Sequence, residues 1–449
     1  MSKWYKIRDT FFIYVYDGAH YLVNVLPFQV FKIENELKDA ENVENYITSI
    51  EKKQIRSKST IIGSYYLPLI ISTNKCNFMC RYCYADGGSY GECVRDIKSE
   101  TIDNIIDFSF NKIAKNDYLI NCSAVEVGVV YFGGEPLTHF KGLEHLVSRM
   151  RYKIQDMNEK FNENKFKPLI ILNTNGTLFK DNVLDFLNLN KDIIEIIISF
   201  DGYYHNKYRI YKSGEATESD VVAGIKAIRD LGLRFSITCT VPPDEIRSID
   251  KNVKYITDMF GKDTEINLSF VRGPVPQVTG KITYPGVLEA QYTKDDLKIF
   301  GRKVAKMIRD GYNIFSKRFV ARAREGGYMV RCPAAIYEFC VYLDGNVYPC
   351  HNFIDEKFKI GNINEGNFDP SKSNIIDIFQ KRMVNRGKCG ECVFQSICLS
   401  SFDCPSHSYY DLNDFYAIDD KTCVAATEIM TALFEKFILE NSGEDNANI

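Results

Sequence analysis

A short cysteine loop constrains this chain more than any other stretch. Residues 67–73 form an apolar, β-branched run, and the loop that follows carries Cys76, Cys80 and Cys83 in the spacing C-x3-C-x2-C. Three thiolates so close together can bind one soft metal centre. Iron–sulfur clusters normally take one cysteine for each of four irons, so this loop would leave one iron without a protein ligand. Such an open position is where a reactant can bind.

The loop resembles that of radical S-adenosylmethionine (SAM) enzymes. The shared features are the cysteine spacing, an aromatic residue before the third cysteine, here Tyr82, and a strand that leads into the loop. The resemblance implies a [4Fe–4S] cluster whose open iron binds the amino and carboxylate groups of SAM, with Tyr82 in the cofactor-binding region. A zinc or redox loop, or three thiols placed by chance, is the alternative.

Length and charge limit the classes of partner. The chain has 449 residues, which favours two or more domains. Its 56 basic and 59 acidic residues are mixed along the sequence and give a net charge of −3, so we expect neither nucleic acid nor an anionic membrane as a partner. Because the sequence has no signal-peptide pattern and no apolar run long enough to span a bilayer, we expect a cytoplasmic protein.

The 14 cysteines favour metal ligation or reduced thiols over disulfides, because the chain is large and has no secretion signal. Eight of them lie between Cys332 and Cys423. Cys122 and Cys239 lie in or beside apolar strands, where we predict buried thiols. Cys93 lies in a glycine-rich turn, and a ligand or catalytic role stays open for it.

From residue 65 to about 273, β-rich runs alternate with amphipathic helical stretches. The predicted strands are 67–73, 125–132, 168–174, 194–200, 234–241 and 265–271. The predicted helices are 99–115, 139–160, 180–188, 218–232, 250–260 and 293–310. This alternation predicts parallel strands with right-handed crossovers, and six repeats are fewer than the eight of a closed barrel. We therefore predict an α/β fold with an open (β/α)6 partial barrel, which the resemblance also implies.

Polar motifs follow two of the predicted strands at the edge where such sheets carry their chemistry. Gly133, Gly134 and Glu135 offer backbone that a ligand can approach and a carboxylate that can accept from an ammonium group. They match the GGEP motif of radical SAM enzymes, which binds the SAM amino group. Asn175, in the segment NTNG, resembles the T-N-G segment near the SAM ribose. In both places an ordinary turn is the alternative.

The fourth predicted strand ends in the segment SFDG, residues 199–202, and His205 and Arg209 follow. This resembles a pattern of the peptide-modifying branch of radical SAM enzymes. The resemblance implies that Ser199 and Arg209 reach the SAM carboxylate, as the fork of an arginine allows. Asp201 is the candidate catalytic residue, either as a substrate-side acid or base or only as an orienting hydrogen-bond acceptor.

The C-terminal cysteines resemble the SPASM extension of radical SAM enzymes. Cys332, Gly345 and Cys350 form C-x12-G-x4-C around a predicted hairpin turn, and C-x2-C-x5-C-x5-C follows. The resemblance implies that the nearer auxiliary cluster takes Cys332, Cys350 and Cys404. It implies that the farther takes Cys389, Cys392, Cys398 and Cys423. The interval before Cys404 has five residues where the family has three, which leaves the reach of Cys404 open.

These ligands are one too few for two four-iron clusters. Either one iron is open or Cys340, inside the first strand of the hairpin, is an eighth ligand, and a buried thiol is an equally good interpretation of Cys340. A pair of structural zinc sites is the alternative for the whole segment, since C-x2-C is also a zinc spacing.

The N-terminal region precedes all of these motifs. Residues 10–25 alternate around an Asp-Gly turn, which predicts a hairpin, and 28–38 and 42–55 have the pattern of short helices. This layout resembles a shortened element that binds a leader peptide by strand addition, and a cap over the barrel is the alternative. The predicted domains are an N-terminal hairpin-helix region at 1–62, the partial barrel at 63–285, bridging helices at 286–330 and a SPASM domain at 331–449.

As a radical SAM/SPASM enzyme, the chain would hold three [4Fe–4S] clusters and SAM, generate a 5'-deoxyadenosyl radical and accept electrons from a small donor such as a flavodoxin or ferredoxin. We expect an oxidoreductase that matures a ribosomally made precursor peptide with a leader, by forming a thioether, a carbon–carbon bond or a small ring. The alternatives are an anaerobic sulfatase-maturing enzyme that makes formylglycine, and a non-catalytic iron–sulfur or zinc scaffold.

Overall fold

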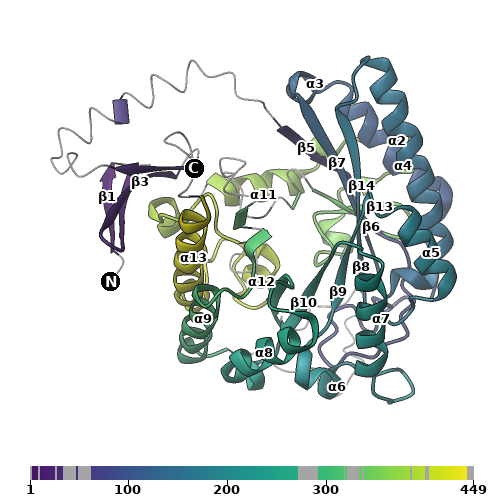
Figure 1. Ribbon diagram of the computed structural model, residues 1–449. Coiled ribbons are helices and arrows are strands. Elements are labelled where there is room, and N and C mark those ends of the chain that lie inside the picture. Colours follow the sequence, from purple (N-terminus) through teal and green to yellow (C-terminus); the bar gives the residue numbers. More distant parts are fainter. Residues whose placement is uncertain are drawn as a thin grey trace.

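Two β-sheets organise the chain, a four-stranded sheet near the N-terminus and a ten-stranded sheet that runs through the rest (Figure 1). The computed structural model describes residues 3–8, 11–25, 28–33, 47–48, 62–271, 292–317, 319–320, 332, 334–335, 338–384, 387–399 and 404–441. The structural statements below concern those residues.

The larger sheet has the strand order β11-β10-β9-β8-β7-β6-β12-β13-β14, and β5 pairs with β7. Its first strands are β5 (Ile62–Tyr66), β6 (Leu69–Ile71), β7 (Ala124–Phe132), β8 (Phe166–Thr174), β9 (Ile194–Ser199), β10 (Phe235–Val241) and β11 (Ile266–Phe270). All neighbours from β6 to β11 are parallel and follow sequence order. The sheet does not close, which confirms the predicted open α/β fold.

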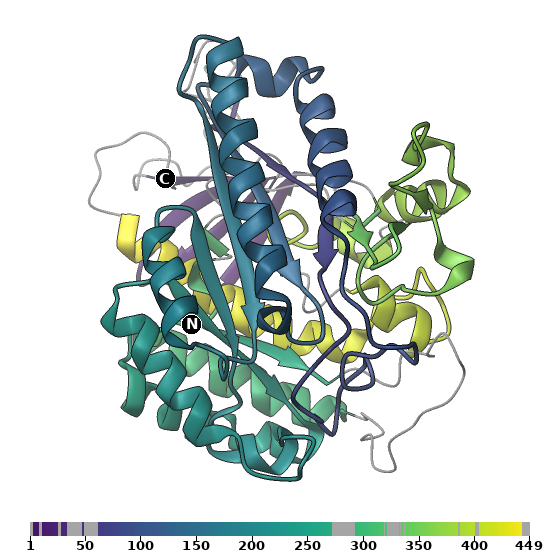
Figure 2. The ribbon, with the colours of Figure 1, turned by 90° about the vertical axis from the view of Figure 1, so that its right-hand side faces the viewer.

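Helices cross over between these strands. They are α2 (Ser99–Ile113), α3 (Asp117–Asn121), α4 (Phe140–Lys160), α5 (Asp181–Leu189), α6 (His205–Tyr208), α7 (Glu218–Asp230), α8 (Ile249–Phe260) and α9 (Lys294–Arg309). Figure 1 shows α2, α4, α5 and α7 on one face of the sheet, and Figure 2 shows the blue and teal helices from outside. Strand β9 buries alternate residues, Ile194, Ile196 and Ile198, because a strand presents every second side chain to the same face.

The C-terminal hairpin extends this same sheet. Its strands are β12 (Cys340–Val341), β13 (Asn346–Tyr348) and β14 (Gly361–Asn362). β12 pairs in parallel with β6, with Cys340 opposite Leu69. Because β6 leads directly into the first cysteine loop, Cys340 of the second group lies on the strand next to it.

Two C-terminal helices follow, α12 (Pro405–Tyr410) and the long α13 (Asp420–Asn441), after α11 (Asn374–Val384). α13 packs against α9, where a Cβ added to Gly301 would come within 2.7 Å of the Cα of Ala425. A glycine at position 301 therefore permits this close approach of the two helices. No helix among the described residues is long and apolar enough to cross a membrane.

The N-terminal sheet is an antiparallel meander of β1 (Lys3–Arg8), β2 (Phe11–Tyr16), β3 (Ala19–Val25) and β4 (Phe28–Ile33). The hairpin predicted at 10–25 is confirmed. The helix predicted at 28–38 is wrong for 28–33, because this stretch pairs along its whole length with β3 and pairing overrides a weak local preference. The helix predicted at 42–55 lies outside the described residues, apart from 47–48.

Candidate active site

The first cysteine loop starts from a buried polar base at the end of β6. The Thr73 hydroxyl donates to Asp96 at 2.6 Å, and Asn74 accepts from the backbone N–H of Arg95 at 2.7 Å and donates to the carbonyl of Cys93 at 2.9 Å. Ser72, Thr73 and Asn74 are almost fully buried. The loop is therefore held by side-chain hydrogen bonds at its base.

The three thiols of the loop are half-buried and interact electrostatically with one another. Burial raises the pKa of Cys80 to about 12, and the charges of Cys83 and Asp201 add to this effect while that of Arg209 opposes it. The pKa of Cys76 is raised too, by burial and then by Cys80, Glu135 and Cys83. A cysteine binds a metal only as the thiolate, so a cluster bound here would have to supply the positive charge that offsets this burial. Three thiols in one loop would give it three ligands.

The Gly-Gly turn after β7 lies against this loop. The N–H of Gly134 donates to the carbonyl of Thr73 at 2.9 Å, and the N–H of Glu135 donates to that of Lys75 at 2.7 Å. A Cβ added to Gly134 would lie 2.3 Å from the Lys75 oxygen. Only glycine fits there, so Gly134 lets the turn pack directly against the backbone of the cysteine loop. The predicted approach of a ligand to this turn stays a prediction.

Glu135 lies fully inside the protein, with 0% of its surface exposed. Its carboxylate accepts from the hydroxyl of Thr174 at 2.7 Å, the N–H of Asn175 at 2.7 Å and the N–H of Leu137 at 3.0 Å. Burial raises its pKa to about 7, against the effect of these hydrogen bonds. The carboxylate thus ties the end of β7 to the end of β8.

Asn175 connects β8 with the cysteine loop. Its amide donates to Asn77 at 2.7 Å, and Asn77 donates to the Thr177 hydroxyl at 2.9 Å. Asn77, between the first two cysteines, was missed by the sequence analysis because a lone asparagine in a loop carries no motif. The network places the predicted ribose-binding segment beside the predicted cluster loop.

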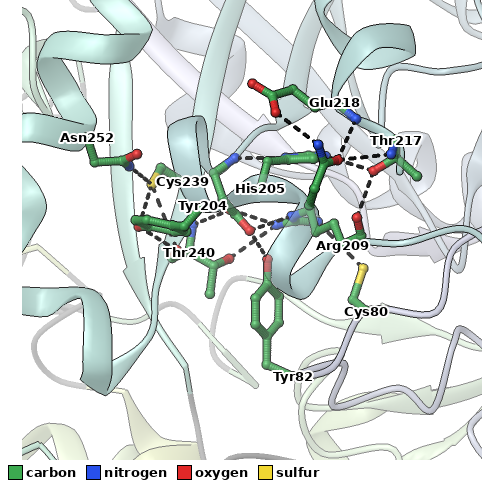
Figure 3. Close-up of polar contacts among 12 residues, drawn as sticks. Cys80, Tyr82, Tyr204, His205, Arg209, Thr217, Glu218, Cys239, Thr240 and Asn252 are labelled. Atoms are coloured by element: carbon green, nitrogen blue, oxygen red, sulfur yellow. Dashed lines mark hydrogen bonds and ion pairs between the residues drawn. The ribbon is translucent and has the colours of Figure 1, made fainter. Parts of the chain in front are cut away.

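Asp201, Arg209 and Tyr82 form one network of hydrogen bonds. Figure 3 shows Tyr82 and Arg209 in it, beside Cys80. Arg209 donates to the Asp201 carboxylate from Nε at 2.8 Å and from Nη2 at 3.3 Å. The Tyr82 hydroxyl and the N–H of Thr240, the latter at 2.8 Å, also donate to it. Asp201 has 0% of its surface exposed and every carboxylate oxygen occupied, which favours the orienting interpretation over the acid–base one.

Arg209 links this network to the cluster loop. Its Nη1 lies 4.0 Å from the sulfur of Cys80, and its guanidinium lies 5.3 Å from the centre of the Tyr82 ring. Burial opposes its charge, but Asp201, Tyr82 and Cys80 together raise its pKa well above the usual value. Ser199 ends β9 half-buried and pairs in register with Thr238.

His205 holds the loop after β9. Its Nδ1 accepts from the N–H of Asp201 at 3.1 Å, so the proton lies on Nε2, which donates to the hydroxyl of Thr217 at 3.0 Å. Burial lowers the pKa of His205 to about 3 and keeps it neutral. Thr217 and Thr240 complete this frame and were also missed, because isolated threonines in or beside a strand give no sequence signal (Figure 3).

In the C-terminal region, the thiol of Cys350 interacts electrostatically with those of Cys332, Cys404 and Cys340, and burial raises its pKa. Cys332, Cys350 and Cys404 are the cysteines that the resemblance assigns to the nearer auxiliary cluster. Cys340, whose role the sequence leaves undecided, is fully buried. The predicted ligands of the farther cluster lie on η6 (Gly387–Glu391), the turn after it and α13: Cys389, Cys392, Cys398 and Cys423. Within the described ranges, no three His, Cys, Asp or Glu side chains are placed to hold a single metal ion.

The remaining cysteines lie outside these groups. Cys122 and Cys239 are buried, as predicted, and Cys239 bonds with the Tyr204 hydroxyl and the Asn252 amide, both at 3.3 Å (Figure 3). Cys93 is exposed.

Comparisons with known proteins bear on this site. Residues 70–256 match the family model of the radical SAM superfamily. The chain is 25% identical over 344 residues to a cysteine-type anaerobic sulfatase-maturating enzyme of Clostridium perfringens, covering 73% of this chain and 85% of the relative. It is 21% identical over 362 residues to the radical SAM cyclopropyl synthase TigE of Paramaledivibacter caminithermalis, covering 78% and 70%. A solved structure described as native anSMEcpe with bound AdoMet shares the fold, with a TM-score of 0.63, 20% identity and coverage of 86% and 100%.

Proposed function

We propose, from the premise that residues 70–256 of this chain form a radical SAM domain, that the protein is a radical SAM enzyme that modifies a peptide. The observation that carries this proposal is the convergence of three thiols, a Gly-Gly turn and Arg209 at one edge of the sheet. When bound, a [4Fe–4S] cluster and SAM supply a carbon radical that removes hydrogen from an unactivated C–H bond. The protein has to hold these groups, orient the substrate and exclude water.

The chain's own residues divide this work. The three loop cysteines would hold three irons and leave the fourth for SAM. Arg209 lies beside Cys80, and its Nε and Nη2 bond to Asp201, so Nη1 is the nitrogen that would donate to the SAM carboxylate. Ser199, at the end of β9, is the second contact that the resemblance implies. We assign Asp201 to positioning Arg209 and not to proton transfer, because its oxygens already accept from protein donors.

The C-terminal thiols would hold two further clusters. The electrostatic contact of Cys350 with Cys332, Cys340 and Cys404 supports four cysteine ligands for the nearer one. This assignment makes Cys340 the eighth auxiliary ligand. Two such centres next to the radical site suit a reaction in which the substrate loses an electron after it loses hydrogen.

The substrate we propose is a ribosomally made precursor peptide whose leader adds a strand to the N-terminal sheet. The outer strands of that sheet, β1 and β4, each pair on one side only among the described strands, and free strand edges bind extended peptides. Intramolecular bond formation is the reaction we favour, with electrons from a small flavodoxin-like or ferredoxin-like donor. A short open reading frame beside the gene would supply the peptide to test.

Sulfatase maturation is the second candidate, because a sulfatase-maturating enzyme is among the relatives and is matched over 85% of its length. The two reactions differ in product mass. Bond formation within a peptide removes hydrogen only, whereas conversion of a cysteine to formylglycine exchanges sulfur for oxygen. Mass spectrometry of a reacted precursor peptide and of a cysteine-containing sulfatase peptide decides between them.

The first test concerns SAM cleavage. Replacing Cys76, Cys80 and Cys83 together with Ala should abolish formation of 5'-deoxyadenosine under dithionite, because the three iron ligands are lost. A Cys93→Ala variant is the matched control, since this thiol is exposed on the following turn and should be dispensable. Continued SAM cleavage by the triple variant would place the active centre elsewhere.

The second test concerns the number of clusters. Reconstituted protein should contain about twelve irons per chain, from one cysteine per iron and three clusters. Iron and sulfide analysis measures this directly. Stoichiometric zinc with only about four irons would contradict the two auxiliary clusters. The cluster of the first cysteine loop would then be the one iron–sulfur centre.

A further inference from the structure

Three polar side chains lie side by side on neighbouring strands of the large sheet. The register pairs Ser199 of β9 with Thr238 of β10, and Thr238 with Asn267 of β11. Neighbouring strands lie about 4.8 Å apart, so this row of side chains spans about 10 Å. We call Ser199, Thr238 and Asn267 the inner polar row, and it contains only neutral hydroxyl and amide groups.

The inner polar row faces away from the helices that cover the sheet. On β10, the thiol of Cys239 bonds with the amide of Asn252 on α8 (Figure 3). On β11, Phe270 packs against Phe300 of α9, with ring centres 5.2 Å apart. Successive side chains of a strand point to opposite faces of its sheet. Because the residues of the row alternate with Cys239 and Phe270, they point to the inner face.

The polar groups of the row lack partners within the part of the chain that the structure describes. Asn267 is 5% exposed, and its Oδ1 has no accessible surface and no hydrogen bond to a described residue. Ser199 and Thr238 are half-buried, and their hydroxyls make no hydrogen bond to a described residue either. Since buried polar groups in folded proteins are almost always hydrogen-bonded, the row can bond to a molecule that enters the inner face.

The row lies next to the site assigned to SAM. Thr240, two residues after Thr238 on β10, accepts a hydrogen bond from Nη2 of Arg209 at 3.2 Å (Figure 3). Two residues of a strand advance about 6.6 Å, so the row lies one layer of side chains deeper than this contact. A molecule bound to the row would therefore lie beside the predicted carboxylate site of SAM.

The chemistry of the row fits peptide groups. It contains no charged side chain, whereas the amino-acid end of SAM carries two charges and needs charged partners such as Arg209. Each peptide unit carries one neutral N–H donor and one neutral C=O acceptor. Hydroxyl and amide side chains can bond to both. The span of the row is about the length of three extended residues.

We propose that Thr238 and Asn267 form a subsite for the substrate peptide and bond to the backbone N–H and C=O groups of a short extended segment. This inference rests on the proposed function, which supplies the peptide. Ser199, the second predicted contact of SAM, is at the other end of the row, so the subsite holds the segment beside SAM. The two residues thereby restrict which hydrogen of the peptide the radical can reach.

The test uses reconstituted full-length enzyme with Thr238→Val or Asn267→Leu, which replace each polar group with an apolar one of similar shape. The probes are SAM and two peptides, the precursor peptide encoded beside the gene and the cysteine-containing sulfatase peptide. For the peptide that the wild type modifies, each variant should lower kcat/KM about tenfold, the effect of one lost hydrogen bond. The affinity for SAM and the iron content should equal those of the wild type.

Thr257→Val is the matched control. This threonine is also buried, but it lies on α8, and its hydroxyl already donates to the carbonyl of Val253 at 3.0 Å. Its kcat/KM for the peptide should equal that of the wild type.

Three outcomes overturn the inference and leave the proposed function intact. Wild-type kcat/KM in both variants would show that the row bonds to no peptide group. Weaker binding of SAM at wild-type iron content would assign the row to SAM. Loss of iron in both variants would make the row a structural element. A wild-type enzyme that cleaves SAM but modifies neither peptide would instead refute the proposed function, and this inference with it.

Discussion

At the scale of single residues, the buried ion pair between Asp201 and Arg209 determines what the site can do. Arg209 is 8% exposed and Asp201 0%, so neither charge is hydrated. A buried pair is retained where geometry matters, because removing one partner leaves an uncompensated charge. Sequence motifs identified both residues and the three cysteines, yet they could not assign Asp201 a role. That role depends on Thr240 and Tyr82, which lie far from it in the chain.

Asp201→Asn tests the positioning role. The asparagine amide carries no charge, so Arg209 would lose its ionic partner, and the amide NH2 group would face other donors. The free energy of unfolding should therefore fall by about 3 kcal/mol or more. SAM affinity should fall with it. Tyr82→Phe removes one donor to this charged carboxylate and should cost about 1.5–3 kcal/mol. Urea unfolding and SAM titration measure both. Wild-type stability and SAM affinity in the Asn variant, with product formation lost, would instead show proton transfer by Asp201.

At the scale of elements, the long buried strands were predictable and the pairings between distant segments were not. Residues 168–174 and 194–200 are rich in leucine and isoleucine, and β8 and β9 lie there. Residues 28–33 gave no such clear pattern, since β3 supplies the hydrogen bonds that make them a strand. The pairing of β12 with β6 joins residues some 270 positions apart, and only tertiary packing decides it.

Helix α12 carries Cys404 at its N-cap and is held by a charged histidine. His407 bonds with Asp411 at 2.5 Å and with Asp419 at 3.2 Å, and the carboxylates raise its pKa to about 9 although burial opposes this. The unfolded chain releases this proton near pH 6.5. Protonated His407 therefore adds up to about 3 kcal/mol to the free energy of unfolding. This contribution is complete below about pH 6.5 and is lost as the pH rises to about 9. Chemical unfolding at pH 6 and pH 9 should show this loss, and His407→Gln should abolish the difference.

At the scale of the whole molecule, one carboxylate joins both ends of the chain. Glu435 on α13 is 3% exposed; it accepts from the Tyr14 hydroxyl of β2 at 2.6 Å and from Arg309 of α9 at 2.6 Å. Trp4 packs beside this contact against Phe434, with ring centres 5.1 Å apart. The N-terminal sheet is thus packed on the C-terminal helix, while the cysteine loop and its motifs lie on the larger sheet.

This separation predicts that the N-terminal sheet can be loosened without loss of the radical site. Glu435→Gln leaves Arg309 without its anionic partner, so the amides of β1–β4 should exchange hydrogen faster, while those of β7–β9 keep wild-type rates. SAM cleavage without a peptide should persist, because every residue assigned to SAM lies between Cys76 and Arg209. Tyr14→Phe removes one hydrogen bond to this carboxylate but leaves its ion pair with Arg309, so it should have a smaller effect on the same amides. Hydrogen exchange with mass detection measures the amides, and a deoxyadenosine assay measures SAM cleavage.

Two outcomes would contradict this prediction. Wild-type exchange of β1–β4 in the Gln variant would show that aromatic packing alone holds the N-terminal sheet. Loss of SAM cleavage would show that the radical site depends on the N-terminal sheet.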